Sequence, residues 1–328
     1  MSSTSTSPPP KPSDRSSIGW QLLRQKPLAD PTTPFTGKTI LITGANSGLG
    51  LAAATKFAAL SPARLILGLW HLDMASHASV AAFARRAADD LPRLDVAVLN
   101  AGVYEVARGV SAHGWERTLQ VNTLSTALLA VLLLPKLRAS SAGRRGEGGG
   151  GGGGGRPSVL EVVASRRVEA VQLAEEQREG GAGVLGSANS VQDGGYKPSE
   201  QYRMSKFLLM GVVKKLAALV DASEVTVTAV CPGGVATNLS RGALLNALIM
   251  RTPEYAARSV VSGALLEPQA SGKLWYDDEL HEVPNLAGED GQKLAEKIWA
   301  EVTDALRRDV PAVGNVLKTL PGFKSVQP

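Results

Sequence analysis

The sequence has one cysteine, Cys231, and only four histidines in 328 residues. A single cysteine excludes an internal disulfide and favours a reducing compartment, so we expect a cytoplasmic protein. The histidines lack metal-ligand spacing, and no metal site is expected. Aromatic residues make up 5% of the chain, and the net charge is +5. Because no basic stripe interleaves with aromatic residues, nucleic acid is not an expected partner.

Long apolar runs are also absent. The longest, ALLAVLLLP at 127–135, is too short to cross a bilayer, so no transmembrane segment is expected. The N-terminus has no apolar segment of the kind that secretory signals carry. Its start is rich in Ser, Thr and Pro, and such a composition predicts a disordered tail over 1–35. A transit peptide is the alternative, although the prolines argue against an amphipathic helix.

Apolar runs alternate with helix-like segments along the rest of the chain. Strands are predicted at 38–43, 94–102, 157–165, 224–234 and 272–278. Helices are predicted at 51–60, 114–137, 200–220 and 253–266, with a further apolar helix stripe at Leu294, Ile298, Val302 and Leu306. This alternation predicts an α/β fold in which helices cover both faces of a parallel sheet. Ligands in such folds bind at the carboxyl ends of the strands.

A glycine-rich turn follows the first predicted strand. Gly44, Gly48 and Gly50 lie between that strand and a helix, which is the setting of a dinucleotide-binding turn. Glycine lets the backbone approach a pyrophosphate at the helix N-terminus. The spacing is Gly-x3-Gly-x-Gly rather than Gly-x-Gly-x2-Gly, and a purely structural turn explains these glycines equally well.

Tyr202 and Lys206, in the stretch YRMSK, lie four residues apart on a predicted helix and therefore share a face. A lysine ammonium beside a phenol favours the phenolate and lowers a pKa that starts near ~10. The pair could thus act in proton transfer. Taken alone, a surface tyrosine and lysine on an amphipathic helix is the alternative.

Together, these motifs resemble the short-chain dehydrogenase/reductase family over residues 36–280. The resemblance rests on the glycine turn, LNAG, Asn122, Ser165, the YRMSK stretch and PGGVAT, in this order. The wording of LITGANSGLG and HGWERTLQVNTL is most similar to the retinol-dehydrogenase-like branch. Similar chains are often tailoring enzymes of fungal secondary metabolism.

The resemblance implies a Rossmann-type, doubly wound sheet in three α/β/α layers and one domain over 36–310, with a C-terminal tail over 311–328. It also implies roles for four catalytic residues. Asn122 would hold a water, Ser165 would hydrogen-bond the substrate oxygen, and Tyr202 would donate the proton. Lys206 would bind the nicotinamide ribose and lower the pKa of the tyrosine. Tyr196 is a rival, but Glu200 rather than a lysine follows it by four residues.

The cofactor implied is NADP, with NAD as the alternative. The cofactor-binding residues that the resemblance implies are Thr43, Gly44, Asn46, Ser47, Gly48, Leu49, Gly50, Asp73, Asn100, Ala101, Gly102, Tyr202, Lys206, Pro232, Gly233, Val235 and Thr237. The substrate would be a lipophilic carbonyl or alcohol, because NLSRGALLNALIM after Thr237 is mostly apolar and this region covers the substrate in the family. Packing within the fold explains this apolar segment equally well. A homodimer is a further expectation.

Three segments depart from the family pattern. A glycine-rich insertion at 143–156 predicts a flexible loop, and the long step from Ser165 to Tyr202 has turn composition and is expected near the mouth of the site. In ARLILGLWHLDMAS, two strand-like runs meet without the crossover that parallel neighbours need. Either one strand is lost, or the run forms one strand of ten residues. A truncated gene model, or a non-catalytic nucleotide-binding relative, is therefore the alternative to an active enzyme.

Overall fold

The computed structural model describes residues 27–67, 70–147, 156–237 and 250–320. In this part of the chain one seven-stranded sheet has the order β2-β1-β3-β4-β5-β6-β7. The strands are β1 (Thr39–Ile42), β2 (Arg64–Ile66), β3 (Val96–Leu99), β4 (Ser158–Val163), β5 (Val225–Val230), β6 (Leu274–Tyr276) and β7 (Glu279–His281). All neighbours pair in parallel except β6 and β7, which form a hairpin.

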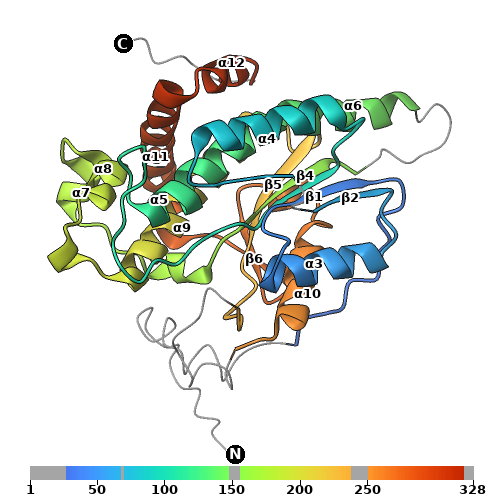
Figure 1. Ribbon diagram of the computed structural model, residues 1–328, viewed down its shortest axis with the longest axis horizontal. Helices are drawn as coiled ribbons and strands as arrows, with labels where there is room; N and C mark the ends of the chain where they lie inside the picture. Colours follow the sequence, from blue (N-terminus) through green and yellow to red (C-terminus); the bar gives the residue numbers. More distant parts are fainter. Residues whose placement is uncertain (1–26, 68–69, 148–155, 238–249, 321–328) are drawn as a thin grey trace, which may run out of the picture.

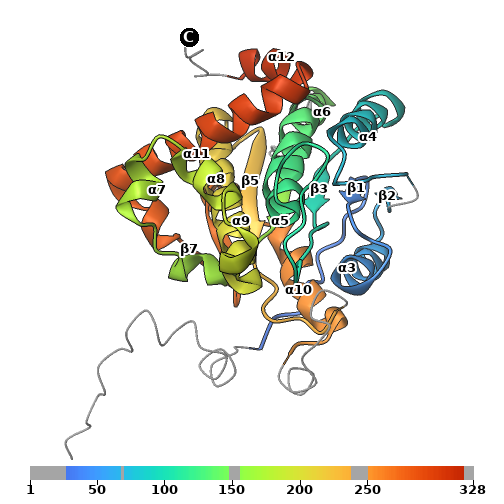
Figure 2. The ribbon, with the colours of Figure 1, turned by 60° about the vertical axis from the view of Figure 1, so that its left-hand side comes forward.

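Helices cover both faces of the sheet (Figures 1 and 2). One face packs against α3 (Gly48–Ala59) and α10 (Pro253–Gly263), with Phe57 and Val260 in its core. The other face packs against α4 (His77–Asp90), α6 (Thr126–Glu147), α9 (Pro198–Leu219) and α11 (Gly288–Asp309). The expected three-layer α/β/α architecture is therefore confirmed, and so is the buried stripe of Leu294, Ile298, Val302 and Leu306 on α11.

The strand register brings several strand ends to one edge. Ile42 of β1 is paired with Val98 of β3, and Leu99 of β3 with Val162 of β4. Val163 and Val230 are partners at the ends of β4 and β5. The residues that follow these four strands therefore emerge side by side, which positions the candidate site.

The predicted long helix at 114–137 is built from three pieces. α5 (Arg117–Leu119) leads into the π-helical segment η1 (Gln120–Ser125) and then into α6. Residues Arg117–Gly143 are long and apolar enough to cross a membrane, but 89% of the most apolar window is buried inside the fold. The apolarity of this helix is accounted for by its place in the core.

Of the two strand-like runs in the stretch ARLILGLWHLDMAS, only the first forms a strand. β2 has three residues, and the described residues 70–76 form no strand before α4 begins at His77, with Ser76 as its N-cap. The alternative of one ten-residue strand was wrong. With no crossover available, β2 becomes the edge of the sheet and pairs with β1.

The folded body is larger than the sequence suggested. Leu28 and Phe35, in the predicted N-terminal tail, are buried. The predicted C-terminal tail contains α12 (Ala312–Lys318), which buries Val313 and Leu317.

The step from Ser165 to Tyr202, expected to be turns, contains η2 (Arg166–Ala170), α7 (Glu175–Glu179), α8 (Gly183–Asn189) and η3 (Asp193–Gly195). Its apolar positions, such as Val184 and Leu185, join the core, and this outweighs the turn composition. Residues 148–155 and 238–249 lie outside the described residues, so the expectations of a flexible loop and a substrate cover stay predictions.

Candidate active site

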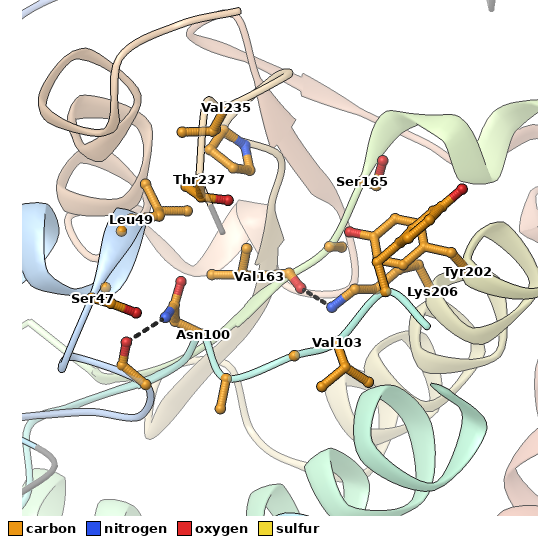
Figure 3. A pocket seen from close by; sticks show the side chains of 18 of the residues that line it. Ser47, Leu49, Asn100, Val103, Val163, Ser165, Tyr202, Lys206, Val235 and Thr237 are labelled. Atoms are coloured by element: carbon orange, nitrogen blue, oxygen red, sulfur yellow. Dashed lines mark hydrogen bonds between the residues drawn. The ribbon is translucent and has the colours of Figure 1, made fainter. Parts of the chain in front are cut away.

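A cavity of about 490 Å³ lies at the shared edge of β1, β3, β4 and β5 (Figure 3). Most of the residues predicted for cofactor binding and catalysis line it together. They are Gly44, Asn46, Ser47, Gly48, Leu49, Gly50, Asn100, Ala101, Gly102, Ser165, Tyr202, Lys206, Pro232, Gly233, Val235 and Thr237. Thr43, Asp73 and Asn122 are not among the lining residues.

The glycine turn requires glycine at more than one position. Gly44 and Gly48 have positive φ of 65° and 52°. A Cβ on Gly50 would lie 2.2 Å from the Gly44 carbonyl oxygen, so no side chain fits there. α3 begins at Gly48, and its N-cap residue Ser47 makes no side-chain capping bond. The turn and the start of this helix line the cavity, and the first N–H groups of a helix have no partner within it, so the site fits a dinucleotide pyrophosphate.

Thr43 and Asn100 connect the glycine turn after β1 to the Asn-Ala-Gly turn after β3. The Thr43 hydroxyl oxygen accepts hydrogen bonds from the backbone N–H groups of Asn100 and Ala101, each at 3.0 Å. The Asn100 amide donates to the Thr43 carbonyl at 3.0 Å. Thr43 is buried, so it supports the cavity wall from behind.

Asn122 fixes the strand-end loop beside α9. Its Oδ1 accepts from the Val103 N–H, and its Nδ2 donates to the Val103 carbonyl, both at 2.9 Å. Nδ2 also contacts the Ser205 hydroxyl at 3.1 Å. The side chain is fully buried within η1. Its implied role in holding a water stays a prediction.

Tyr202 and Lys206 lie on one face of α9 and point into the cavity (Figure 3). Lys206 Nζ donates to the Val163 carbonyl at 2.8 Å and lies 5.9 Å from the centre of the Tyr202 ring. Burial lowers the pKa of Lys206 to about 8.

The expected effect of the lysine on the tyrosine was wrong for this structure. Burial raises the pKa of Tyr202 above its ordinary value near 10, and the charge of Arg167 opposes that rise. Lys206 directs its hydrogen bond to a backbone carbonyl instead. At neutral pH the tyrosine therefore keeps its proton.

Ser165 lies across from Tyr202 at the end of β4, as Figure 3 shows. Its hydroxyl oxygen accepts from the Arg167 N–H at 3.3 Å, which starts the turn of η2. The Arg167 guanidinium donates to the Ser199 hydroxyl at 2.8 Å and so lies next to the first turn of α9. Arg167 was missed by sequence reasoning, although it is two residues from Ser165.

Other wall residues were not singled out from the sequence. The Tyr104 ring lies 5.5 Å from the Tyr202 ring, measured between centres. The remaining members of this group are Val103, Glu105, Val163 and Ala164. Their positions in the sequence could have identified them, because they directly follow Asn-Ala-Gly or directly precede Ser165.

Two candidates lie away from the cavity lining. Asp73 is exposed, and its Oδ1 accepts from the Ala75 N–H at 2.9 Å just before α4. The rival Tyr196 donates to the Glu105 carbonyl at 3.1 Å and contacts the Glu116 carboxylate at 3.3 Å.

Two histidines converge although their spacing gave no sign of it. The Nδ1 atoms of His77 and His113 lie 2.8 and 3.1 Å from the same oxygen of Asp309. Their rings stack at 4.1 Å with an interplanar angle of 30°. A metal must lie close to the plane of each imidazole that binds it, and stacked rings do not offer a common point. We therefore interpret the cluster as hydrogen bonds that tie α4 and its neighbouring loop to α11.

Comparisons with known proteins agree with this site. The family pattern described as short chain dehydrogenase matches residues 63–145. Short-chain dehydrogenase/reductase ffsI of Aspergillus flavipes is 38% identical over 356 positions, covering 97% of this chain and 99% of that protein. Short-chain dehydrogenase/reductase phmF of Phaeosphaeria nodorum is 35% identical over 344 positions, covering 93% and 97%.

A solved structure shares the fold. The NADPH-bound carbonyl reductase from chicken fatty liver superposes with a TM-score of 0.56 at 18% identity, covering 75% of this chain and 94% of that one. The 356 positions of the Aspergillus alignment exceed the 328 residues of this chain, so the relative has segments that this chain lacks. The chain belongs to the short-chain dehydrogenase/reductase family of oxidoreductases, which act on CH–OH and C=O groups.

Proposed function

We propose that the protein interconverts a carbonyl and an alcohol on a lipophilic small molecule with a nicotinamide cofactor, NADP by preference. The observation that carries this proposal is one cavity lined by the glycine turn, Ser165, Tyr202 and Lys206. The fungal origin of the similar relatives supports a role in secondary metabolism. A cytoplasmic location, a homodimer and the retinol-dehydrogenase-like branch are part of the same proposal.

The residues of the cavity suit the two ends of such a cofactor. The turn of Gly44, Gly48 and Gly50 would hold the pyrophosphate, and Lys206 would bind the nicotinamide ribose. Pro232, Gly233, Val235 and Thr237 would contact the nicotinamide. When bound, the reduced cofactor supplies the hydride.

Proton delivery falls to the chain's own side chains. Tyr202, whose pKa is ordinarily near 10 and is raised by burial, is protonated at neutral pH and can donate to a carbonyl oxygen as negative charge develops there. The Ser165 hydroxyl faces the same space and can donate a second hydrogen bond to that oxygen. The proton would be replaced through Lys206 and a water held by Asn122. In the reverse direction the deprotonated Tyr202 would accept the proton of an alcohol, so the same residues serve both directions.

A matched pair of tyrosine variants tests this assignment. Tyr202→Phe should lower turnover of a panel of lipophilic ketones by at least about 100-fold while cofactor binding survives, since positioned proton transfer is worth roughly 10²- to 10⁴-fold. Tyr196→Phe is the control and should retain turnover, because that hydroxyl lies outside the cavity lining. Near-normal turnover in Tyr202→Phe would rule the mechanism out.

A non-catalytic, nucleotide-binding relative is the second candidate, and the missing crossover before Leu72 favours it. Sequencing the transcript separates a real deletion from a truncated gene model. Additional in-frame codons between Gly68 and Leu69 would show that the native enzyme has the crossover. A matching transcript, together with no ketone turnover, would favour the non-catalytic relative.

A further inference from the structure

Asp277 lies in the turn between β6 and β7, in a left-handed backbone conformation that Asp and Asn tolerate. Asp277 and Asp278 have positive φ of 49° and 56°, and Tyr276 pairs with Glu279 across them. A two-residue turn of this type favours Asn-Gly or Asp-Gly, so an aspartate suits position 277. The contacts of its carboxylate with two arginines point to a role beyond the turn.

The Asp277 carboxylate joins two arginines from distant parts of the chain. One oxygen accepts from Arg251 at 2.8 Å, and the other lies 3.4 Å from an Arg166 nitrogen. The side chains are 3% exposed for Arg251 and 15% exposed for both Asp277 and Arg166. Arg251 is buried and the other two side chains are half-buried, so the bridge is partly shielded from water, and loss of the carboxylate removes the charge that it places between the two arginines.

Arg251 connects Asp277 to the turn that follows β5. Its guanidinium donates to the Pro232 carbonyl at 3.1 Å. Its backbone N–H donates to the Gly234 carbonyl at 2.8 Å, and its carbonyl accepts from the Ala236 N–H at 3.0 Å. A Cβ on Gly233 would lie 3.1 Å from the Arg251 guanidinium, so the turn packs directly on this side chain.

Arg166 connects Asp277 to the end of β4. It directly follows Ser165, and its guanidinium also lies over the Tyr276 ring at 5.7 Å. Two lining segments of the cavity, the turn at 232–237 and the Ser165 segment, are therefore connected to one carboxylate.

We propose that Asp277 is a positioning residue which, through Arg251 and Arg166, holds the 232–237 turn at the distance from Ser165 that the nicotinamide ring requires. This inference rests on the proposed function, because it assumes that a nicotinamide lies between those walls. Asp277 touches neither substrate nor cofactor in this account. The contacts of Arg251 are with Pro232, Gly234 and Ala236, so we expect the effect to be largest at the nicotinamide end and smaller at Thr237, which packs against Gly48 of the glycine turn.

Two isosteric variants of the same turn test the proposal. Asp277→Asn keeps a residue that tolerates positive φ and removes the carboxylate charge. Asp278→Asn makes the same change at the next position, where the carboxylate accepts from the Ala29 N–H instead of an arginine. Each variant is titrated with NADPH and NADH and with the matching 2′-phospho-ADP-ribose and ADP-ribose, which lack the nicotinamide.

Asp277→Asn should weaken binding of the preferred dinucleotide by about tenfold while leaving the ADP-ribose affinity within about twofold. Asp278→Asn should change neither affinity. General loss of structure would weaken both ligands together, so an equal loss would overturn the proposal, as would an Asp277→Asn variant indistinguishable from Asp278→Asn. If Asp277→Asn does not fold, Arg166→Gln removes only the contact between Asp277 and the Ser165 segment. It must still lower the affinity for the dinucleotide more than the affinity for ADP-ribose. Failure of the unaltered protein to bind either dinucleotide would instead refute the proposed function.

Discussion

The catalytic end of the cavity and its edge at β2 differ in how many elements support them. Around Tyr202, the ends of β1, β3 and β4, the segment η1 and helix α9 are connected by hydrogen bonds of Thr43, Asn122 and Lys206. At the other end, β2 has three residues and pairs with β1 at the edge of the sheet. Asp73, the acidic residue expected there, lies outside the cavity lining.

If the proposed roles hold, the residues proposed for catalysis and the proposed adenosine end lie in separate parts of the fold. In a parallel sheet of order β2-β1-β3-β4-β5, material lost beyond β1 removes an edge and leaves the central strands paired. The residues proposed for catalysis lie at the end of β4 or within η1 and α9, which pack on the central strands, so we expect them to keep their positions. We therefore expect the missing crossover to reduce affinity for the cofactor more than it affects the chemistry.

Among the tests that compare the two ends of the cavity, Lys206→Met is expected to have the largest effect on dinucleotide affinity and turnover. Loss of hydrogen bonds from a charged group costs about 1.5–3 kcal/mol, so affinity for the dinucleotide should fall by roughly 10- to 100-fold, and turnover should fall with it. ADP-ribose should bind as before. Titration of NADPH and ADP-ribose checks this, and an unchanged NADPH affinity would show that Lys206 does not contact the ribose.

The same lysine predicts a pH dependence. The pKa of Lys206 is lowered by burial to about 8 in the protein without cofactor. Its ammonium therefore loses its proton as pH rises through this value, and affinity for NADPH should decline across the same range. In Lys206→Met the decline should be absent, which separates this side chain from other groups that titrate there.

Restoring the crossover should produce a smaller change at the other end. Inserting the corresponding segment of the Aspergillus flavipes relative between Gly68 and Leu69 should tighten dinucleotide binding by about tenfold, which is ~1.4 kcal/mol. Turnover at saturating cofactor should stay within about twofold. A Gly-Ser insert of equal length is the control. A gain in turnover without a gain in affinity would reverse the assignment of the two ends.

The smallest effect concerns stability, and it should leave both ends unchanged. Glu161, in the middle of β4, is fully buried, and its carboxyl oxygens have no hydrogen-bond partner among the described residues. Burial raises its pKa well above the ordinary value. A raised pKa in the folded state means that stability is retained below the unfolded value near 4.5 and is lost as pH rises above it.

Glu161→Gln removes this loss, because glutamine has nearly the same shape and does not ionise. Its melting temperature should exceed that of the unaltered protein by a few degrees at pH 7, and the two should converge near pH 4. Melting curves across this range check the sign. A variant less stable than the parent at pH 7 would show that the Glu161 charge is accommodated.

The sequence predicted the central part of the fold well, because its signals there are local. Buried strands read as β-branched runs, and the glycine turn, Asn-Ala-Gly, Ser165 and the Tyr202–Lys206 pair lie at strand ends or on one helix face. Features that depend on distant residues were missed. The bridge from Asp277 to Arg166 and Arg251 joins three segments, and the raised pKa of Tyr202 follows from burial by surrounding elements.

The helices α7, α8 and α12 were missed for a related reason. Their segments have the composition of turns or tails, and they are helical because their few apolar residues join a core supplied by other helices. α8 packs against α9 and α11, and α12 packs against α6. Tertiary packing outweighs weak local propensity in such short helices.

The most direct test of the account is dinucleotide binding by the unaltered protein and by Gly50→Ala. The central claim is that the cavity at the carboxyl ends of the strands holds a nicotinamide dinucleotide by its glycine turn. A Cβ at position 50 would lie 2.2 Å from the Gly44 carbonyl oxygen and would displace that turn. The account predicts saturable binding of NADPH or NADH that ADP-ribose displaces, and loss of this binding in Gly50→Ala with the fold retained by circular dichroism. No binding by the unaltered protein, or undiminished binding in Gly50→Ala, would contradict it.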